Sequence, residues 1–129
     1  MIRKWNQLQL LILADQPGPV IAYKLVTDKY TGASYAGLYY TVGAEIVDSR
    51  PYCDNPAIDC GCGINLATMA WVLQNWVNGQ RIMQVECFPS EGICIPNGTD
   101  GKFRVQRCKV LKEMDLAELG LVDAEEVDQ

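Results

Sequence analysis

The chain of 129 residues contains no histidine. Imidazole is the commonest general acid or base in active sites and a frequent ligand of catalytic zinc. Its absence excludes Ser-His-Asp and Cys-His nucleophile systems and most catalytic zinc sites. The chain also lacks any apolar run near the ~20 residues that a membrane-spanning helix needs. We therefore expect neither histidine-based catalysis nor a membrane partner.

Basic residues are missing from the end of the chain. All 11 Lys and Arg lie at or before Lys112, where nine acidic residues accompany them, so residues 1–112 carry a net charge of +2. Seven acidic residues and no basic one follow, and the whole chain has a net charge of −5. A nearly neutral body does not favour nucleic-acid binding, which needs clustered cations. We expect one domain over residues 1–121 and an acidic, flexible tail over 122–129.

Cysteine is too sparse for a disulfide scaffold, with six in the chain. The short apolar run Leu10–Ala14 has no small-residue cleavage site after it, so we expect no secretory signal, a cytoplasmic location and reduced thiols. Packing roles, a regulatory disulfide and a metal site at Cys53, Cys60 and Cys62 all remain open. The C-x-C spacing departs from the paired C-x₂₋₄-C pattern of zinc sites. We therefore expect no metal and no cofactor.

The segment from Asp59 to Gly79 contains the strongest helical pattern in the chain. Apolar side chains recur at three- and four-residue steps, which predicts a main helix over about residues 66–78. Asn65 is the expected N-cap, because its side-chain oxygen can accept a bond from a free N–H of the first turn. Gly79 suits the left-handed position after the helix.

Period-two alternation predicts strands on both sides of this helix. The expected strands are Val20–Thr27, Leu38–Val42, Ala44–Val47, Arg81–Phe88, Ile93–Pro96 and Phe103–Leu111. The run 5–14 suits either a short helix or a buried strand. A long irregular connection covers 48–63 and a turn covers 97–101. The order favours the α+β class, with a strongly bent, mainly antiparallel sheet packed on one main helix.

Three features suggest ligand binding, and each has a plainer structural interpretation. Gly61 and Gly63 precede the expected helix, where free N–H groups attract anions, but glycines also simply permit a tight turn. Five tyrosines gather between residues 23 and 40, and tyrosine suits ligand pockets as well as half-buried strands. Alternation places Lys102, Arg104 and Gln106 on the face opposite Phe103, so this basic face could bind a small anion or simply be solvated.

Three segments together resemble an uncharacterised domain of bacteriophage and bacterial proteins that is often found beside pentapeptide repeats. They are DQPGPVIAYKLV from Asp15, CGINLAT from Cys62 and IPNGTDGKFRVQRC from Ile95. The resemblance covers most of residues 10–116, and its TDGKFRV run is the most specific part. It implies a phage or bacterial origin, with the host cytoplasm as the location if the chain is phage-encoded, and it implies no assigned activity.

A looser similarity links the chain to the ADP-ribosyltransferase fold. Tyr23-Lys24, the GLYY run from Gly37 and the GINLAT run from Gly63 correspond to that fold's strand starts and its turn into a helix. The Ser-Thr-Ser element and the Glu-x-Glu pair of that fold are absent here, and Glu86 or Glu91 is the nearest replacement. This similarity implies a degenerate NAD-binding or nucleotide-binding domain.

We therefore expect a non-catalytic binding or interaction domain, with a protein or a small anionic ligand as its partner. The alternative is the degenerate ADP-ribosyltransferase-like domain, which would bind NAD or a nucleotide. The candidate ligand-binding residues are Tyr23, Lys24, Asn65, Thr68 and Arg104.

Overall fold

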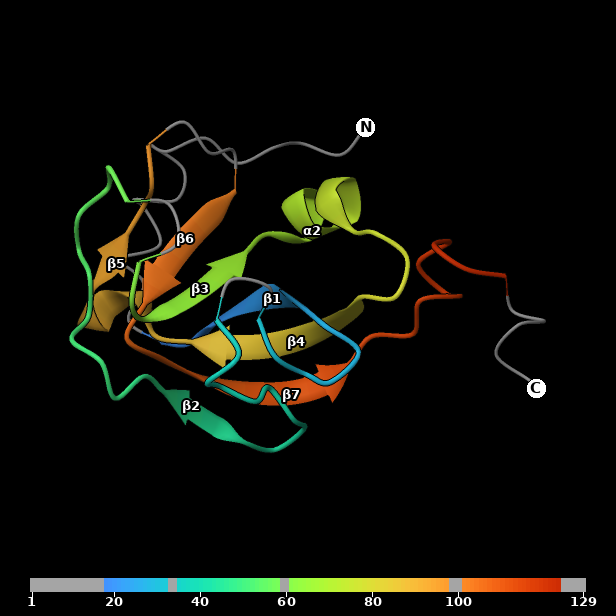
Figure 1. Ribbon diagram of the computed structural model, residues 1–129, viewed down its shortest axis with the longest axis horizontal. Helices are drawn as coiled ribbons and strands as arrows, with labels where there is room; N and C mark the ends of the chain where they lie inside the picture. Colours follow the sequence, from blue (N-terminus) through green and yellow to red (C-terminus); the bar gives the residue numbers. More distant parts are fainter. Residues whose placement is uncertain (1–17, 33–34, 59–60, 98–100, 124–129) are drawn as a thin grey trace.

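The computed structural model describes residues 18–32, 35–58, 61–97 and 101–123. In these residues, seven strands form one curled antiparallel sheet in the order β2-β7-β4-β1-β3-β6-β5 (Figure 1). The elements are β1 (Val20–Val26), β2 (Glu45–Val47), β3 (Ile64–Ala67), α2 (Met69–Asn75), β4 (Arg81–Cys87), the 3₁₀-helix η2 (Pro89–Glu91), β5 (Ile93–Cys94), β6 (Lys102–Val105) and β7 (Arg107–Glu113). The expected mainly antiparallel, bent sheet is confirmed.

The connection from β6 to β7 shows how strongly the sheet curls. Only Gln106 separates these strands in the sequence, yet β4, β1 and β3 lie between them in the sheet. The prediction of one strand over Phe103–Leu111 was therefore wrong. Gln106 and Arg107 are both exposed, so the inward–outward alternation shifts by one residue there, and the chain changes partners from β3 and β5 to β4 and β2.

The main core lies on the inner face of the curled sheet. Met83, Val85 and Cys87 of β4 are fully buried, which confirms the inward positions predicted from alternation. Ile82 on the opposite face of β4 is also fully buried, and it packs with Val72 of α2 and Ala67 in a second, smaller cluster. Helix α2 therefore packs on the outer face through the fully buried Val72, with Met69 and Trp71 partly buried against the same cluster.

The helix is shorter than predicted and begins later. Leu66 lies in β3, where it pairs with Phe103 of β6, and the helix covers only Met69–Asn75. Its N-cap is Thr68, whose Oγ1 accepts a 3.3 Å bond from the Trp71 N–H, so the prediction of Asn65 as the cap was wrong. The spacing of Leu66 fitted a helix, but the backbone around it is satisfied by pairing with β6, which periodicity along the chain does not reveal.

The other predicted strands differ at their ends or in kind. The predictions for the strands now labelled β1, β2 and β4 agree with the structure to within one residue, and the expected strand 93–96 covers only Ile93–Cys94. Residues 38–42 form no strand; Tyr39 makes an isolated bridge to Thr31 instead. The expected element at 5–14, the centre of the turn at 98–100 and residues 124–129 of the tail lie outside the described residues. No described helix is long and apolar enough to cross a bilayer.

Candidate functional site

A cavity of about 280 Å³ lies beside β1 and β3. Its walls also include the segment between β1 and β2, the glycines before β3, and the exposed side of α2. Small-molecule sites in proteins have volumes of roughly 300–1,000 Å³. The cavity therefore suits a ligand at the small end of that range.

Three cationic side chains line this cavity, and each lies over an aromatic ring that also lines it. The distances to the ring centroids are 5.3 Å for Nζ of Lys24 over Tyr40, 3.4 Å for Cζ of Arg50 over Tyr35 and 5.5 Å for Nζ of Lys102 over Trp71. A cation over a ring face is attracted by the ring's quadrupole. The cavity wall thus combines positive charge with flat apolar surface.

Lys24 reaches the cavity from the middle of β1. Its ammonium group donates a 2.7 Å hydrogen bond to the backbone carbonyl of Asn65 in β3. Strands β1 and β3 are neighbours in the sheet. This bond fixes the ammonium group at the junction of the two strands. The side chain is only half-buried, so its charge acts on the cavity without complete loss of hydration.

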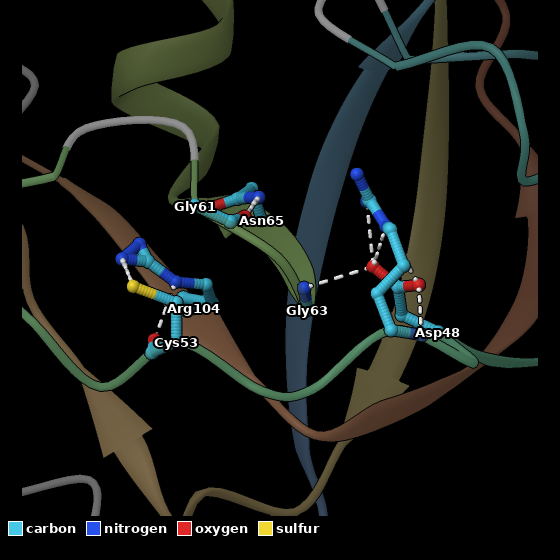
Figure 2. Close-up of polar contacts among 7 residues, drawn as sticks. Asp48, Cys53, Gly61, Gly63, Asn65 and Arg104 are labelled. Carbon is cyan, nitrogen blue, oxygen red and sulfur yellow. Dashed lines mark hydrogen bonds and ion pairs between the residues drawn. The ribbon is translucent and has the colours of Figure 1, made fainter.

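Arg50 is held by Asp48, two residues before it. The carboxylate accepts from Nη2 of Arg50 at 2.6 Å and from the backbone N–H of Gly63 at 3.0 Å, and its side chain is only 3% exposed (Figure 2). The hydrogen bond from the Arg50 side chain is the main reason that the pKa of Asp48 is lowered to about 2. Asp48 thereby ties the segment after β2 to the start of β3.

Two polar atoms in the cavity wall have no hydrogen-bond partner among the described residues. Tyr40 is 2% exposed, and its hydroxyl makes no hydrogen bond in the described part of the chain. Burial raises the pKa of this hydroxyl. The Asn65 amide donates from Nδ2 to the carbonyl of Gly61 at 2.9 Å, which leaves its buried Oδ1 unpaired.

The structure brings three of the five predicted ligand-binding residues to this cavity. Tyr23, Lys24 and Asn65 line it together. Thr68 caps α2 instead and does not line the cavity. Arg104 does not line the cavity.

Arg104 is fully buried, which corrects the prediction that it lies on an open face of the sheet. Its Nε donates to the carbonyl of Cys53 at 2.9 Å (Figure 2). Its Nη2 donates to the carbonyl of Ile58 at 3.0 Å. The alternation of β6 was read correctly, but the irregular segment 51–58 covers that face. Arg104 therefore holds this segment against the sheet and is enclosed by neutral acceptors.

The two glycines before β3 allow Arg104 to lie directly behind the cavity wall. A Cβ at Gly61 would lie 2.8 Å from Sγ of Cys53 and 3.1 Å from Cζ of Arg104. Gly63 has a φ of +125°, and a Cβ there would lie 2.9 Å from the ring of Tyr52. Close approach of the backbone to these side chains, together with a positive φ at Gly63, explains the glycines better than an anion-binding turn does.

Of the three cysteines considered as metal ligands, the structure describes Cys53 and Cys62, and Cys60 lies outside the described residues. The backbone N–H of Cys53 donates to the carbonyl of Cys62 at 2.9 Å, so the two chain segments are adjacent. Within residues 18–32, 35–58, 61–97 and 101–123, no three His, Cys, Asp or Glu side chains are grouped as metal ligands. The five cysteines that the structure describes form no disulfide with one another.

Sequence reasoning did not select five residues that form the cation–ring pairs of the cavity. They are Tyr35, Tyr40, Arg50, Trp71 and Lys102. Tyr40 belonged to the cluster of tyrosines seen in the sequence, and Lys102 to the basic strand, so each had a weak signal. Arg50 had none, because nothing in an irregular segment shows which way a side chain points.

Comparison with models of protein families, with curated protein sequences and with solved structures finds no match to this chain. The proposals below therefore rest on the geometry of the cavity and on the sequence itself.

Proposed function

We propose that this protein is a non-catalytic binding domain for a small organic anion that carries a flat ring. The observation that supports the proposal is the convergence of three cation–ring pairs on one cavity. Cationic side chains recognise carboxylate or phosphate oxygens, and aromatic side chains stack on flat rings. A ligand that has both features complements the cavity wall better than a simple ion or an uncharged ring does.

The size and charge of the cavity narrow the class further. A volume of about 280 Å³ suits a single ring system with one anionic group better than a dinucleotide. Arg50 forms an ion pair with Asp48, and Lys24 and Lys102 are the other cationic side chains in the wall. The preferred ligand is therefore a monoanion or dianion of modest size.

Nucleotide binding is the second candidate function. It is favoured by the same aromatic and cationic wall, since a nucleotide joins a flat base to a phosphate. The resemblance to the ADP-ribosyltransferase fold points to this candidate too. The proposal includes an origin in phage or bacterial proteins, which is supported by the sequence resemblance. It also includes a cytoplasmic location, which is supported by the small number of cysteines.

The test is a titration of the purified protein with phenyl phosphate, benzoate, phenol and inorganic phosphate, with AMP and NAD as the nucleotide arm. Isothermal calorimetry and thermal unfolding are both read, because a ligand at 100 times its Kd adds about 2.7 kcal/mol to the unfolding free energy. We expect phenyl phosphate or benzoate to bind more tightly than phenol and inorganic phosphate.

Matched variants locate the binding. Lys24→Met and Lys102→Met each remove a cation from the cavity wall and should weaken binding by about tenfold or more. Lys112→Met removes an exposed cation of β7 that lies outside the cavity and should leave affinity unchanged. Failure of every anion to bind, or an equal loss in all three variants, would overturn the proposed function.

A further inference from the structure

We infer that the Tyr40 hydroxyl is a specificity contact that donates to the anionic group of the ligand, at the buried end of the cavity beside Lys24. This inference rests on the proposed function and identifies the ligand's charged end as an oxyanion, either a phosphate ester or a carboxylate. Tyr40 was not among the residues selected from the sequence, and its role follows from its burial and its unpaired hydroxyl.

Two half-buried tyrosines, Tyr30 and Tyr52, show what is unusual about Tyr40. Tyr52 donates to the backbone carbonyl of Arg104 at 3.0 Å, and Tyr30 donates to Oε1 of Glu113 at 2.8 Å. Tyr40 is more buried than either, yet its hydroxyl has no partner in the described part of the chain. A buried hydroxyl without a partner costs free energy, and few native groups remain so unless something else binds them.

Tyr40 also lines the cavity, and the whole residue is only 2% exposed. In the part of the chain that the structure describes, Asn65 Oδ1 is a buried side-chain atom that is shut off from solvent and has no hydrogen-bond partner, and the Tyr40 hydroxyl is not in that class. In this inference the Tyr40 hydroxyl lies at the cavity surface, where a ligand atom would meet it.

The neighbours of Tyr40 determine what kind of atom it should meet. The ammonium group of Lys24 lies 5.3 Å from the centroid of its ring, and ammonium groups only donate hydrogen bonds. An O–H donor on a ring that carries an ammonium group over its face complements an atom that accepts several bonds and carries negative charge, which is an oxyanion. The Asp48 carboxylate also acts on this hydroxyl, and its charge is paired with that of Arg50. Tyr35 also lines the cavity and is more exposed, at 39%.

The experiment compares Tyr40→Phe with Tyr52→Phe, two variants that each remove one tyrosine hydroxyl. Affinity for phenyl phosphate and for benzoate is measured by calorimetry, and the free energy of unfolding is measured in urea without ligand. Tyr40→Phe should weaken binding about tenfold to a hundredfold while stability stays equal or rises, since an unpaired buried hydroxyl is removed. Tyr52→Phe should lower stability, because a formed hydrogen bond is lost, and should leave affinity within about twofold.

The outcomes separate this inference from the proposed function. If Tyr40→Phe binds as tightly as the wild type while Lys24→Met loses affinity, the role of Tyr40 is overturned and the proposed function stands. If no probe binds the wild-type protein, both are overturned. Tighter binding of phenyl phosphate than of benzoate identifies the oxyanion as a phosphate ester, and the reverse order identifies it as a carboxylate.

Discussion

Arg104 shows how a single charged residue organises the part of the fold behind the cavity. It is fully buried, and its donors meet backbone carbonyls of the segment 51–58 and the sulfur of Cys94. Removing a guanidinium group from water is costly unless its donors are satisfied. The fixed fork of five N–H donors can satisfy several carbonyls at once, which the ammonium group of lysine cannot do in the same geometry.

Replacement of Arg104 should therefore destabilise the protein strongly. Arg104→Met leaves the carbonyls of Cys53 and Ile58 without their donors, and we expect a loss of about 2–4 kcal/mol in the free energy of unfolding in urea. The matched control is Arg107→Met, which removes an exposed ion pair with Glu91 and should cost at most about 1 kcal/mol. Equal losses in the two variants would contradict a structural role that is specific to Arg104.

At the scale of elements, the sequence predicted the strands in which one face is more buried than the other. Alternation revealed β1 and β4, because one face of each enters the core. It could not separate β6 from β7, since a change of pairing partner alters the alternation at one point only. It also assigned Leu66 to a helix, because a strand of four residues is too short to show its own period.

The sequence predicted an irregular connection after β2 but not what holds it in place, and Asp48 is one of the residues that do so. The pKa of Asp48 is about 2 in the folded protein, against its ordinary value of 3.8. A carboxyl group with a lowered folded-state pKa stabilises the protein above its unfolded-state pKa, and this contribution is lost as the pH falls from about 3.8 to 2. Stability from this group is therefore full at neutral pH and absent in strong acid.

The variant Asp48→Asn should be less stable than the wild type by about 1–2 kcal/mol near pH 6. The gap should close as the pH is lowered toward 2, when it is followed by urea unfolding monitored through tryptophan fluorescence. Glu91→Gln, which alters an exposed ion pair, should differ little from the wild type across the same range. A gap for Asp48→Asn that is independent of pH would contradict the ionic role of this carboxylate.

At the scale of the whole molecule, the curl of the sheet creates the candidate site. It brings the middle of β1, Arg50 after β2 and the glycines before β3 around one cavity. The sequence predicted the α+β class and the bent antiparallel sheet, and it selected Tyr23, Lys24 and Asn65. It could not predict the convergence of Arg50, Trp71 and Lys102, because they are distant in the chain and meet only through the order of the strands.

The most direct test of the proposed binding site is a ¹H–¹⁵N NMR titration of the wild-type protein with phenyl phosphate. We predict saturable shifts in the amides of 23–25 and 63–66 and in the indole of Trp71, all around the cavity, with Lys109 of β7 unchanged. Shifts confined to the exposed basic residues of β7, or no saturable shift at all, would contradict the assignment of this cavity as a site for a ring-bearing anion.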